Sequence, residues 1–290
     1  MPNYTTIISA SELQGLQASG APLKIFDCSF DLSQPEAGMA MYRDDRIAGS
    51  IYVHLDADLS AKTPALKAKA VSGGRHPLPS REDFAQWLSS VGFDNSMQAV
   101  VYDRQGNNFC GRLWWMLKWA GHDNVAVLDG GLHAWQAAGG QMRSGPMPRH
   151  RAKTFNLQPS LVTLVDVSTV ESFLGQPSQT IVDARGSARY KGEQEPLDPV
   201  AGHIPGALNR PFTQNFDSSG MFKPASVLRA EFEALLHGRD ASTVVHQCGS
   251  GVSAVPNVLA MQIAGLGTTA LFAGSWSEWC SSPHRAVEKG

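Results

Sequence analysis

The segment with the clearest capacity for chemistry begins at Cys248. Residues 244–247 have strand character and precede this cysteine, and residues 254–264 have the pattern of a helix. Between them, Gly249 and Gly251 allow backbone conformations closed to other residues, so successive amides can turn inward around the sulfur. Such amides and the start of a helix favour the thiolate, which is the nucleophilic form of cysteine. The loop therefore predicts a reactive thiol.

Three alternatives compete with this interpretation. A free cysteine also packs well, as a small hydrophobic residue, in a strand-to-helix turn. A cysteine phosphatase would need an arginine six residues after its nucleophile, and that position is Ala254. A dinucleotide site would use Gly249, Gly251 and Ala254 as a G-x-G-x-x-A fingerprint, but it also needs an acid at the end of the next strand. Residues 271–274 contain no acid, so both rival enzyme classes are disfavoured.

The remaining cysteines show no sign of activation in the sequence. Cys28, Cys110 and Cys280 lie far apart, and the chain's 4 cysteines form no Cys-x-x-Cys pair. This spacing predicts neither a zinc site nor a disulfide framework. We expect these three thiols to be packing residues.

The composition is that of an ordinary globular protein. Of the 290 residues 42% are hydrophobic and 17% charged, and the formal net charge is -2. This balance lacks the basic field that nucleic-acid binding requires. The first residues lack the features of a signal peptide, and no apolar stretch is long enough to span a membrane. We therefore expect a cytoplasmic protein with small-molecule or protein partners.

The sequence also contains an internal repeat. Residues 100–103 can be laid over residues 244–247 without gaps, with a shift of 144 (244 − 100). The same shift relates two further pairs of residues along the chain: Gly130 and Gly274, Trp135 and Trp279. In this alignment Arg104 takes the place of Cys248. We therefore expect the first copy to lack this reactive thiol.

Strand and helix patterns alternate within each copy. The strand-like runs are residues 23–27, 99–103, 125–128, 180–183, 243–247 and 269–272. Ser9 with Glu12, and Ser168 with Glu171, have the spacing of capping boxes and predict helix starts. The alternation predicts an α/β fold with two tandem domains, each a mainly parallel sheet flanked by helices. Functional sites in such sheets lie beyond the carboxyl ends of the strands.

The repeat also predicts where the chain divides. We expect residues 1–142 to form an inactive N-terminal domain and residues 161–290 a catalytic C-terminal domain. Residues 143–160, which are rich in proline and basic residues, have the composition of an exposed linker.

Four motifs together resemble a known family. They are CGSGVSA at residues 248–254, GHIPGA at 202–207, DAR at 183–185 and GSWSEW at 274–279. In this combination the chain resembles the tandem-domain rhodanese-like sulfurtransferases, and among them the 3-mercaptopyruvate sulfurtransferases. The resemblance covers nearly the whole chain, and it implies two rhodanese-like domains of which the second carries the reactive cysteine.

The resemblance also implies the residues of the site. Cys248 would carry the sulfur, and Ser250, His76 and Asp58 would form a proton relay. The residues implied in substrate binding are Arg189, Arg185, Gly249, Gly251, Val252 and Ser253. The family usually has a second arginine near position 197, where this chain has Leu197.

The implied reaction is the transfer of sulfane sulfur through a persulfide on Cys248. A thiol, cyanide or a thioredoxin-like protein would then accept the outer sulfur, with neither metal nor organic cofactor. Because Ser250 lies between glycines and leaves the loop neutral, we expect 3-mercaptopyruvate to be a better donor than the dianion thiosulfate. Two alternatives stay open: a thiosulfate:cyanide sulfurtransferase, and a non-catalytic rhodanese-like module that binds a partner or senses oxidants.

Overall fold

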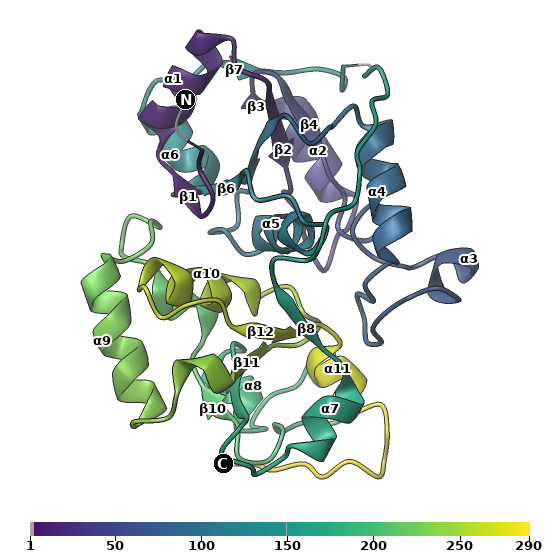
Figure 1. Ribbon diagram of the computed structural model, residues 1–290, viewed down its shortest axis with the longest axis vertical. Helices are drawn as coiled ribbons and strands as arrows, with labels where there is room; N and C mark the ends of the chain where they lie inside the picture. Colours follow the sequence, from purple (N-terminus) through teal and green to yellow (C-terminus); the bar gives the residue numbers. More distant parts are fainter. Residues whose placement is uncertain (1–2, 149) are drawn as a thin grey trace. The chain divides into compact units, whose positions relative to one another are not determined.

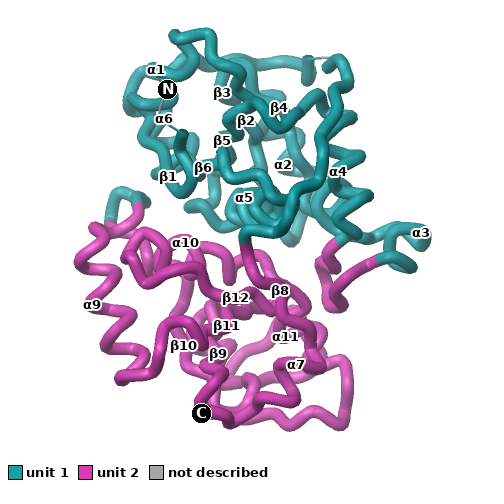
Figure 2. Tube along the Cα trace, viewed as in Figure 1, with its two compact units in different colours: residues 1–69, 79–161, 218–221 teal, residues 70–78, 162–217, 222–290 magenta. Residues whose placement is uncertain are grey.

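The computed structural model describes residues 3–148 and 150–290. The chain divides into two compact units (Figures 1 and 2). Unit 1 contains residues 1–69, 79–161 and 218–221, and unit 2 contains residues 70–78, 162–217 and 222–290. The short segment 70–78 thus belongs to unit 2, although most of its neighbours in sequence belong to unit 1.

Unit 1 is built around a five-stranded parallel sheet. Its strands, in spatial order, are β1 (Ile7–Ile8), β6 (Val125–Leu128), β5 (Gln98–Tyr102), β2 (Leu23–Asp27) and β4 (Ser50–Tyr52). Its helices are α1 (Ala10–Ser19), α2 (Ala37–Asp44), α3 (Pro64–Lys67), α4 (Arg81–Ser90), α5 (Cys110–Trp119) and α6 (Gly131–Ala137). A separate antiparallel pair joins β3 (Arg46–Ile47) to β7 (Met142–Arg143). Side chains of α1 and α6 share one apolar core with the sheet.

Unit 2 has a second five-stranded parallel sheet. Its strands, in spatial order, are β10 (Leu208–Asn209), β9 (Thr180–Asp183), β11 (Val244–Gln247), β12 (Ala270–Phe272) and β8 (Thr163–Val165). Its helices are α7 (Val167–Ser172), α8 (Ser187–Tyr190), α9 (Ala225–Leu236), α10 (Val255–Ile263) and α11 (Ser275–Trp279), with 3-10 turns η1 (Phe212–Asn215) and η2 (Ala241–Thr243). Side chains of α7 and α11 pack with this sheet in one apolar core.

The two sheets have the same strand order. Reading unit 2 from β8 to β10 reproduces the order of unit 1 from β1 to β4, with β5 and β11 at the centre. All residues of these two central strands are buried, as expected for parallel strands covered on both faces. The prediction of two α/β domains with parallel sheets is therefore confirmed.

The pairing of the central strands corrects the alignment of the two copies by one residue. Asp27 lies opposite Tyr102 in unit 1, and its counterpart Asp183 lies opposite Gln247 in unit 2. The residue after each strand end is therefore Asp103 in one copy and Cys248 in the other. The prediction that Arg104 replaces Cys248 was wrong. The ungapped alignment failed because α10 has 9 residues where α5 has 10, so the shift changes within the repeat.

The two predicted helix starts had different outcomes. At α1, the Ser9 side chain accepts the Glu12 amide and the Glu12 side chain accepts the Ser9 amide, which confirms the capping box. At α7 the cap is Asp166, whose carboxylate accepts the Thr169 amide at 2.7 Å. The capping box predicted at Ser168 was wrong, because an aspartate two residues earlier satisfies the same kind of amide.

The segment between the two copies is attached to unit 1. Lys153 donates to the Asp94 carboxylate at 2.7 Å, and the pKa of that carboxyl is lowered to about 2, mainly by this hydrogen bond. Phe155 is buried and stacks on Phe93. These contacts hold an extended stretch of chain, residues 150–161, against the body of unit 1. Within residues 3–148 and 150–290, no helix is long and apolar enough to cross a membrane.

Candidate functional site

The Cys248 loop joins the central strand β11 to helix α10. Cys248 is buried, and its amide donates to the Ser275 hydroxyl at 3.1 Å. The carbonyl oxygens of Cys248 and Gly249 accept the amides of Trp276 and Ser277 at 3.0 and 2.9 Å. The start of α11 therefore fixes the backbone on both sides of the sulfur-bearing residue.

The loop requires glycine at position 251. Gly251 has a φ of 74°, in the left-handed region, and a Cβ atom there would overlap the carbonyl oxygen of Ala273. The amides of five other loop residues have no protein acceptor among the residues that the structure describes: Gly249, Ser250, Val252, Ser253 and Ala254. Unpaired amide donors in a largely buried loop are suited to an anion.

Unit 1 contains the same turn with an anion built into it. Asp103 is 1% exposed, and one carboxylate oxygen accepts the amides of Gln105 and Asn107 at 3.0 and 2.9 Å. The other oxygen accepts the amides of Phe109 and Cys110 at 2.7 and 3.0 Å. Burial raises the pKa of the Asp103 carboxyl, and these four amides oppose that rise. The strand-to-helix turn of this fold can therefore surround an anion with amides at the position that Cys248 takes in unit 2.

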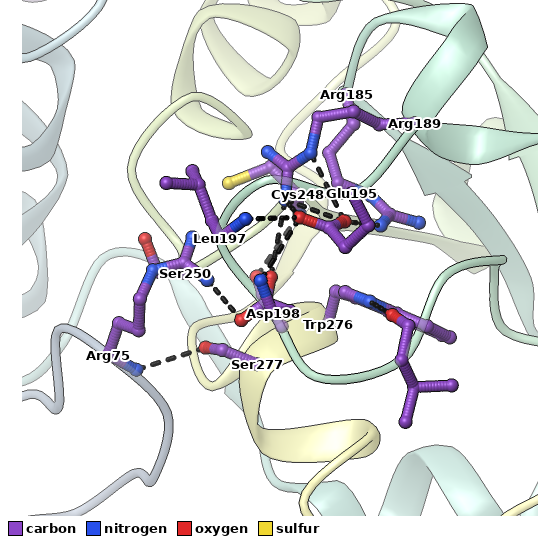
Figure 3. A network of polar contacts seen from close by, with 12 residues as sticks. Arg75, Arg185, Arg189, Glu195, Leu197, Asp198, Cys248, Ser250, Trp276 and Ser277 are labelled. Atoms are coloured by element: carbon purple, nitrogen blue, oxygen red, sulfur yellow. Dashed lines mark hydrogen bonds and ion pairs between the residues drawn. The ribbon is translucent and has the colours of Figure 1, made fainter. Parts of the chain in front are cut away.

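His76 and Ser250 are brought together within unit 2. His76 Nδ1 lies 2.7 Å from the Ser250 hydroxyl, and both side chains are buried. The adjacent Arg75 amide donates to the Ser277 hydroxyl at 3.0 Å (Figure 3). Gly74 has a φ of 81°, and a Cβ atom there would meet the carbonyl oxygen of Gly274. The segment that carries the histidine is thus held against α11.

Arg189 and Arg185 form ion pairs with nearby carboxylates. Arg189 donates to Glu195 at 2.7 and 2.9 Å and to Asp198 at 3.2 Å (Figure 3). Arg185 donates to Asp183 at 2.7 Å, and its guanidinium lies 4.7 Å from the ring centroid of Trp276. Arg189 keeps 21% of its side chain exposed, whereas Arg185 keeps 1%. Arg189 is therefore accessible to a ligand, and Arg185 is a buried member of the network.

Arg75 is a cation of this network that the sequence did not single out. Its guanidinium pairs with Asp198, the carboxylate that Arg189 also contacts (Figure 3). Leu197, at the place where the resemblance implies an arginine, is 45% exposed. Two features of the sequence could have indicated Arg75. Leu197 stands where a cation was expected, and an arginine directly precedes His76.

Asp58 belongs to unit 1, where both of its carboxylate oxygens accept hydrogen bonds. One accepts the His54 amide at 2.7 Å and the other the Trp87 indole N–H at 3.0 Å. Burial raises the pKa of this carboxyl.

The other three thiols lie in environments that oppose ionisation. Burial raises the pKa of Cys28 and Cys110 well above the ordinary value, and it also raises the pKa of Cys280. All four cysteines are free thiols. In the part of the chain that the structure describes, no group of three or more His, Cys, Asp or Glu side chains could hold a metal ion.

Comparison with known proteins identifies the family. The model of the rhodanese-like domain matches residues 9–138 and 166–282. A curated relative from Pseudomonas aeruginosa, named a probable 3-mercaptopyruvate sulfurtransferase, is 42% identical over 98% of both chains. A putative thiosulfate sulfurtransferase, SseB of Mycobacterium tuberculosis, is 37% identical over 98% of this chain and 97% of its own.

A solved structure agrees with these matches. The 3-mercaptopyruvate sulfurtransferase SseA of Escherichia coli superposes with a TM-score of 0.77 at 28% identity, over 95% of this chain and 100% of that one. The chain therefore belongs to the rhodanese-like sulfurtransferase family, with two rhodanese-like domains in one polypeptide.

Proposed function

We propose that this protein transfers sulfane sulfur through a persulfide on Cys248. The observation that carries the proposal is the loop of unpaired amides at the end of β11, matched in unit 1 by four amides around the Asp103 carboxylate. The same kind of loop would stabilise a thiolate before the reaction and a persulfide anion after it. The relatives are named as sulfurtransferases, which supports this proposal.

The proposed donor is 3-mercaptopyruvate. The Cys248 thiolate attacks the donor sulfur and breaks its bond to carbon, and the bonding electrons leave on the carbon as the enolate of pyruvate. The proton of the donor thiol must then move from sulfur to that carbon, which leaves pyruvate and a persulfide anion. His76 and Ser250, hydrogen-bonded at 2.7 Å, are proposed to move this proton.

Thiosulfate is the second candidate donor. Its cleavage by a thiolate expels sulfite and moves no proton, so it does not need the histidine–serine pair. The two guanidinium groups of Arg75 and Arg189, which meet at Asp198, favour an anionic ligand of either kind. The neutral loop alone led us to expect a preference for 3-mercaptopyruvate. These two arginines reduce that expected preference, because a cation outside the loop can offset the second negative charge of thiosulfate.

The remaining residues have supporting roles in the proposal. Arg189 binds the donor's carboxylate, and Arg185 holds Glu195 and Asp183 in place. Gly249, Gly251, Val252 and Ser253 supply the loop backbone. Asp58 is proposed as a member of the proton relay on the strength of the family resemblance alone.

In the second half-reaction, a thiol, cyanide or a thioredoxin-like protein attacks the outer sulfur and regenerates the Cys248 thiolate. The cycle is covalent and of the ping-pong type, and it requires no metal or organic cofactor. We propose a cytoplasmic location, since four free thiols suit a reducing compartment. Residues 1–142 are proposed as the inactive domain, in that they hold no cysteine that forms a persulfide, although their segment 70–78 with His76 belongs to unit 2. Residues 161–290 are proposed as the catalytic domain.

Steady-state kinetics with both donors test the proposal. Ser250→Ala and His76→Asn should each lower kcat/KM for 3-mercaptopyruvate by about 10²- to 10⁴-fold, since they remove the proton carrier. The same variants should change kcat/KM for thiosulfate by about threefold or less, because no proton moves in that reaction. Equal losses with both donors would contradict the assigned role of the pair. Higher kcat/KM for thiosulfate in the unmodified protein would reverse the order of the two donors.

A further inference from the structure

We propose that Arg75 is the second guanidinium that binds the donor's carboxylate, in the role that Leu197 cannot fill. The inference rests on the proposed function and assigns a specificity-determining residue to the same site. It follows from three observations on Arg75, Arg189 and Gly249.

The first observation is that the two arginines share one buried carboxylate. Asp198 pairs with Arg75 through Oδ1 and with Arg189 through Oδ2, the latter at 3.2 Å (Figure 3). The Asp198 side chain is only 3% exposed, whereas Arg75 and Arg189 keep 26% and 21% of their side chains exposed. Asp198 therefore holds two solvent-accessible cations at fixed positions.

The second observation is that only some of the guanidinium nitrogens donate hydrogen bonds to protein carboxylates. Arg75 bonds to Asp198 through Nη1, and Arg189 bonds to its carboxylates through Nε and Nη2. Arg75 Nη2 and Arg189 Nη1 donate to no acceptor among the described residues. These two nitrogens can each donate to one oxygen of a ligand's carboxylate, which is the geometry that guanidinium groups favour.

The third observation places the same two nitrogens beside the Cys248 loop. A Cβ atom on Gly249 would lie 2.8 Å from Arg75 Nη2 and 3.4 Å from Arg189 Nη1. The φ of Gly249 is not in the left-handed region, so its backbone does not require glycine. The missing side chain instead lets both guanidinium ends approach the backbone of the residue that follows the cysteine, so the two unoccupied nitrogens lie directly beside the Cys248 loop.

An α-keto acid fits this arrangement. Its carboxylate would take one hydrogen bond from each arginine, while its reactive carbon end extends toward Cys248. An arginine at position 197 would supply the same charge from the chain segment beside Asp198. In this protein the charge comes instead from the residue directly before His76, so one short segment would supply both a binding group and the proton carrier.

The test separates binding from turnover. Pyruvate, the expected product, is titrated by calorimetry into Cys248→Ser protein, which cannot carry sulfur. Adding Arg75→Gln should weaken pyruvate binding by about 10- to 100-fold, the value of a hydrogen bond to a charged group. Adding Leu197→Arg to that variant should restore at least part of the affinity. Lys191→Ala, which removes an exposed positive charge near α8, is the matched control and should change the affinity less than twofold.

Each outcome bears on a stated claim. Unchanged pyruvate affinity in the Arg75→Gln protein, with loss in an Arg189→Gln protein, overturns the inference. Weakened binding that Leu197→Arg does not improve also overturns it, because Arg75 would then act only through folding of the loop. A failure of the proposed function has a different signature: pyruvate binding that depends on Arg75 in a protein that never accepts sulfur. In the active protein, Arg75→Gln should raise KM for 3-mercaptopyruvate and leave kcat within about threefold, if binding is uniform.

Discussion

Asp103 and Cys248 occupy the same place in the two copies of the fold. Each directly follows the central strand of its sheet, and the carbonyl oxygen of each accepts an amide from the beginning of the next short helix, Leu132 or Trp276. In unit 1 the Asp103 carboxylate takes four loop amides. One copy thus has a buried carboxylate where the other has a thiol.

The first prediction concerns the stability of unit 1. Asp103→Asn replaces one carboxylate oxygen with an NH₂ group that faces amide donors, so two buried hydrogen bonds are lost and donors oppose each other. We expect the free energy of unfolding to fall by about 3 kcal/mol. Urea unfolding measures it, with Asp31→Asn, a partly exposed aspartate in the same unit, as the control. A loss below about 1 kcal/mol would show that the four amides do not depend on the carboxylate.

The second prediction separates strain from hydrogen bonding at Ser275. Ser275 has a φ of 55°, which is unfavourable for a residue with a side chain, yet its hydroxyl accepts the Cys248 amide and donates to Phe272. Ser275→Gly loses both bonds but relieves the strain, so the free energy of unfolding should change by about 1 kcal/mol or less. Ser275→Ala keeps the strain and should cost about 2 kcal/mol.

Both substitutions at Ser275 remove the acceptor that orients the Cys248 backbone. We expect kcat/KM to fall about tenfold in each variant, measured on the folded protein. Equal stability of the glycine and alanine variants would contradict the strain argument. Full activity in both would show that the hydroxyl does not position the cysteine.

The third prediction contrasts the two glycines of the loop. Gly251→Ala places a methyl group against the backbone of Ala273 in a left-handed conformation, and it should prevent stable folding of the loop. Gly249→Ala meets only the guanidinium ends of two flexible side chains, so the protein should fold with nearly unchanged Tm. Its methyl group would displace the Arg75 and Arg189 guanidinium ends from the loop, where they are proposed to bind the donor. We expect kcat/KM to fall at least about tenfold, and an active Gly249→Ala protein would contradict that placement.

The fourth prediction concerns acid sensitivity. His246 lies in β11 and is fully buried, and burial lowers its pKa to about 3, so it stays neutral in the folded state. Below about pH 6.5 only the unfolded state gains this proton, and the free energy of unfolding falls by up to about 1.4 kcal/mol per pH unit until about pH 3. Between pH 7.5 and 5.0 the unmodified protein should lose about 2 kcal/mol more than His246→Leu. Parallel pH dependences of the two proteins in urea unfolding would refute this.

Much of the architecture was predictable because the strands are buried on both faces and read as short apolar runs between turns. The runs at residues 23–27, 125–128 and 180–183 coincide with β2, β6 and β9. The one-residue error at Arg104 arose because the helix after the central strand differs in length between the two copies. In so short a repeat, nothing in the sequence marks where the extra residue lies. Strand pairing decides the register, and pairing partners are distant in sequence.

The site was less predictable than the fold. The CGSGVSA motif indicated Cys248, and the resemblance indicated His76 and Arg189. In unit 2, His76 contacts Ser250 and Arg189 contacts Glu195. Arg75 could not be found in this way, because its contact with Asp198 joins residues 123 positions apart. A local motif predicts a loop, but a charge network depends on which segments the fold brings together.

The persulfide on Cys248 is the central claim, and intact-mass measurement after incubation with a sulfur donor tests it most directly. With 3-mercaptopyruvate, the protein should gain the mass of one sulfur atom, which a thiol acceptor should remove and which Cys248→Ser should abolish. Peptide mapping should locate the added sulfur on Cys248 and on none of Cys28, Cys110 and Cys280. Absence of the added mass with both donors, or its location on another cysteine, would contradict the account.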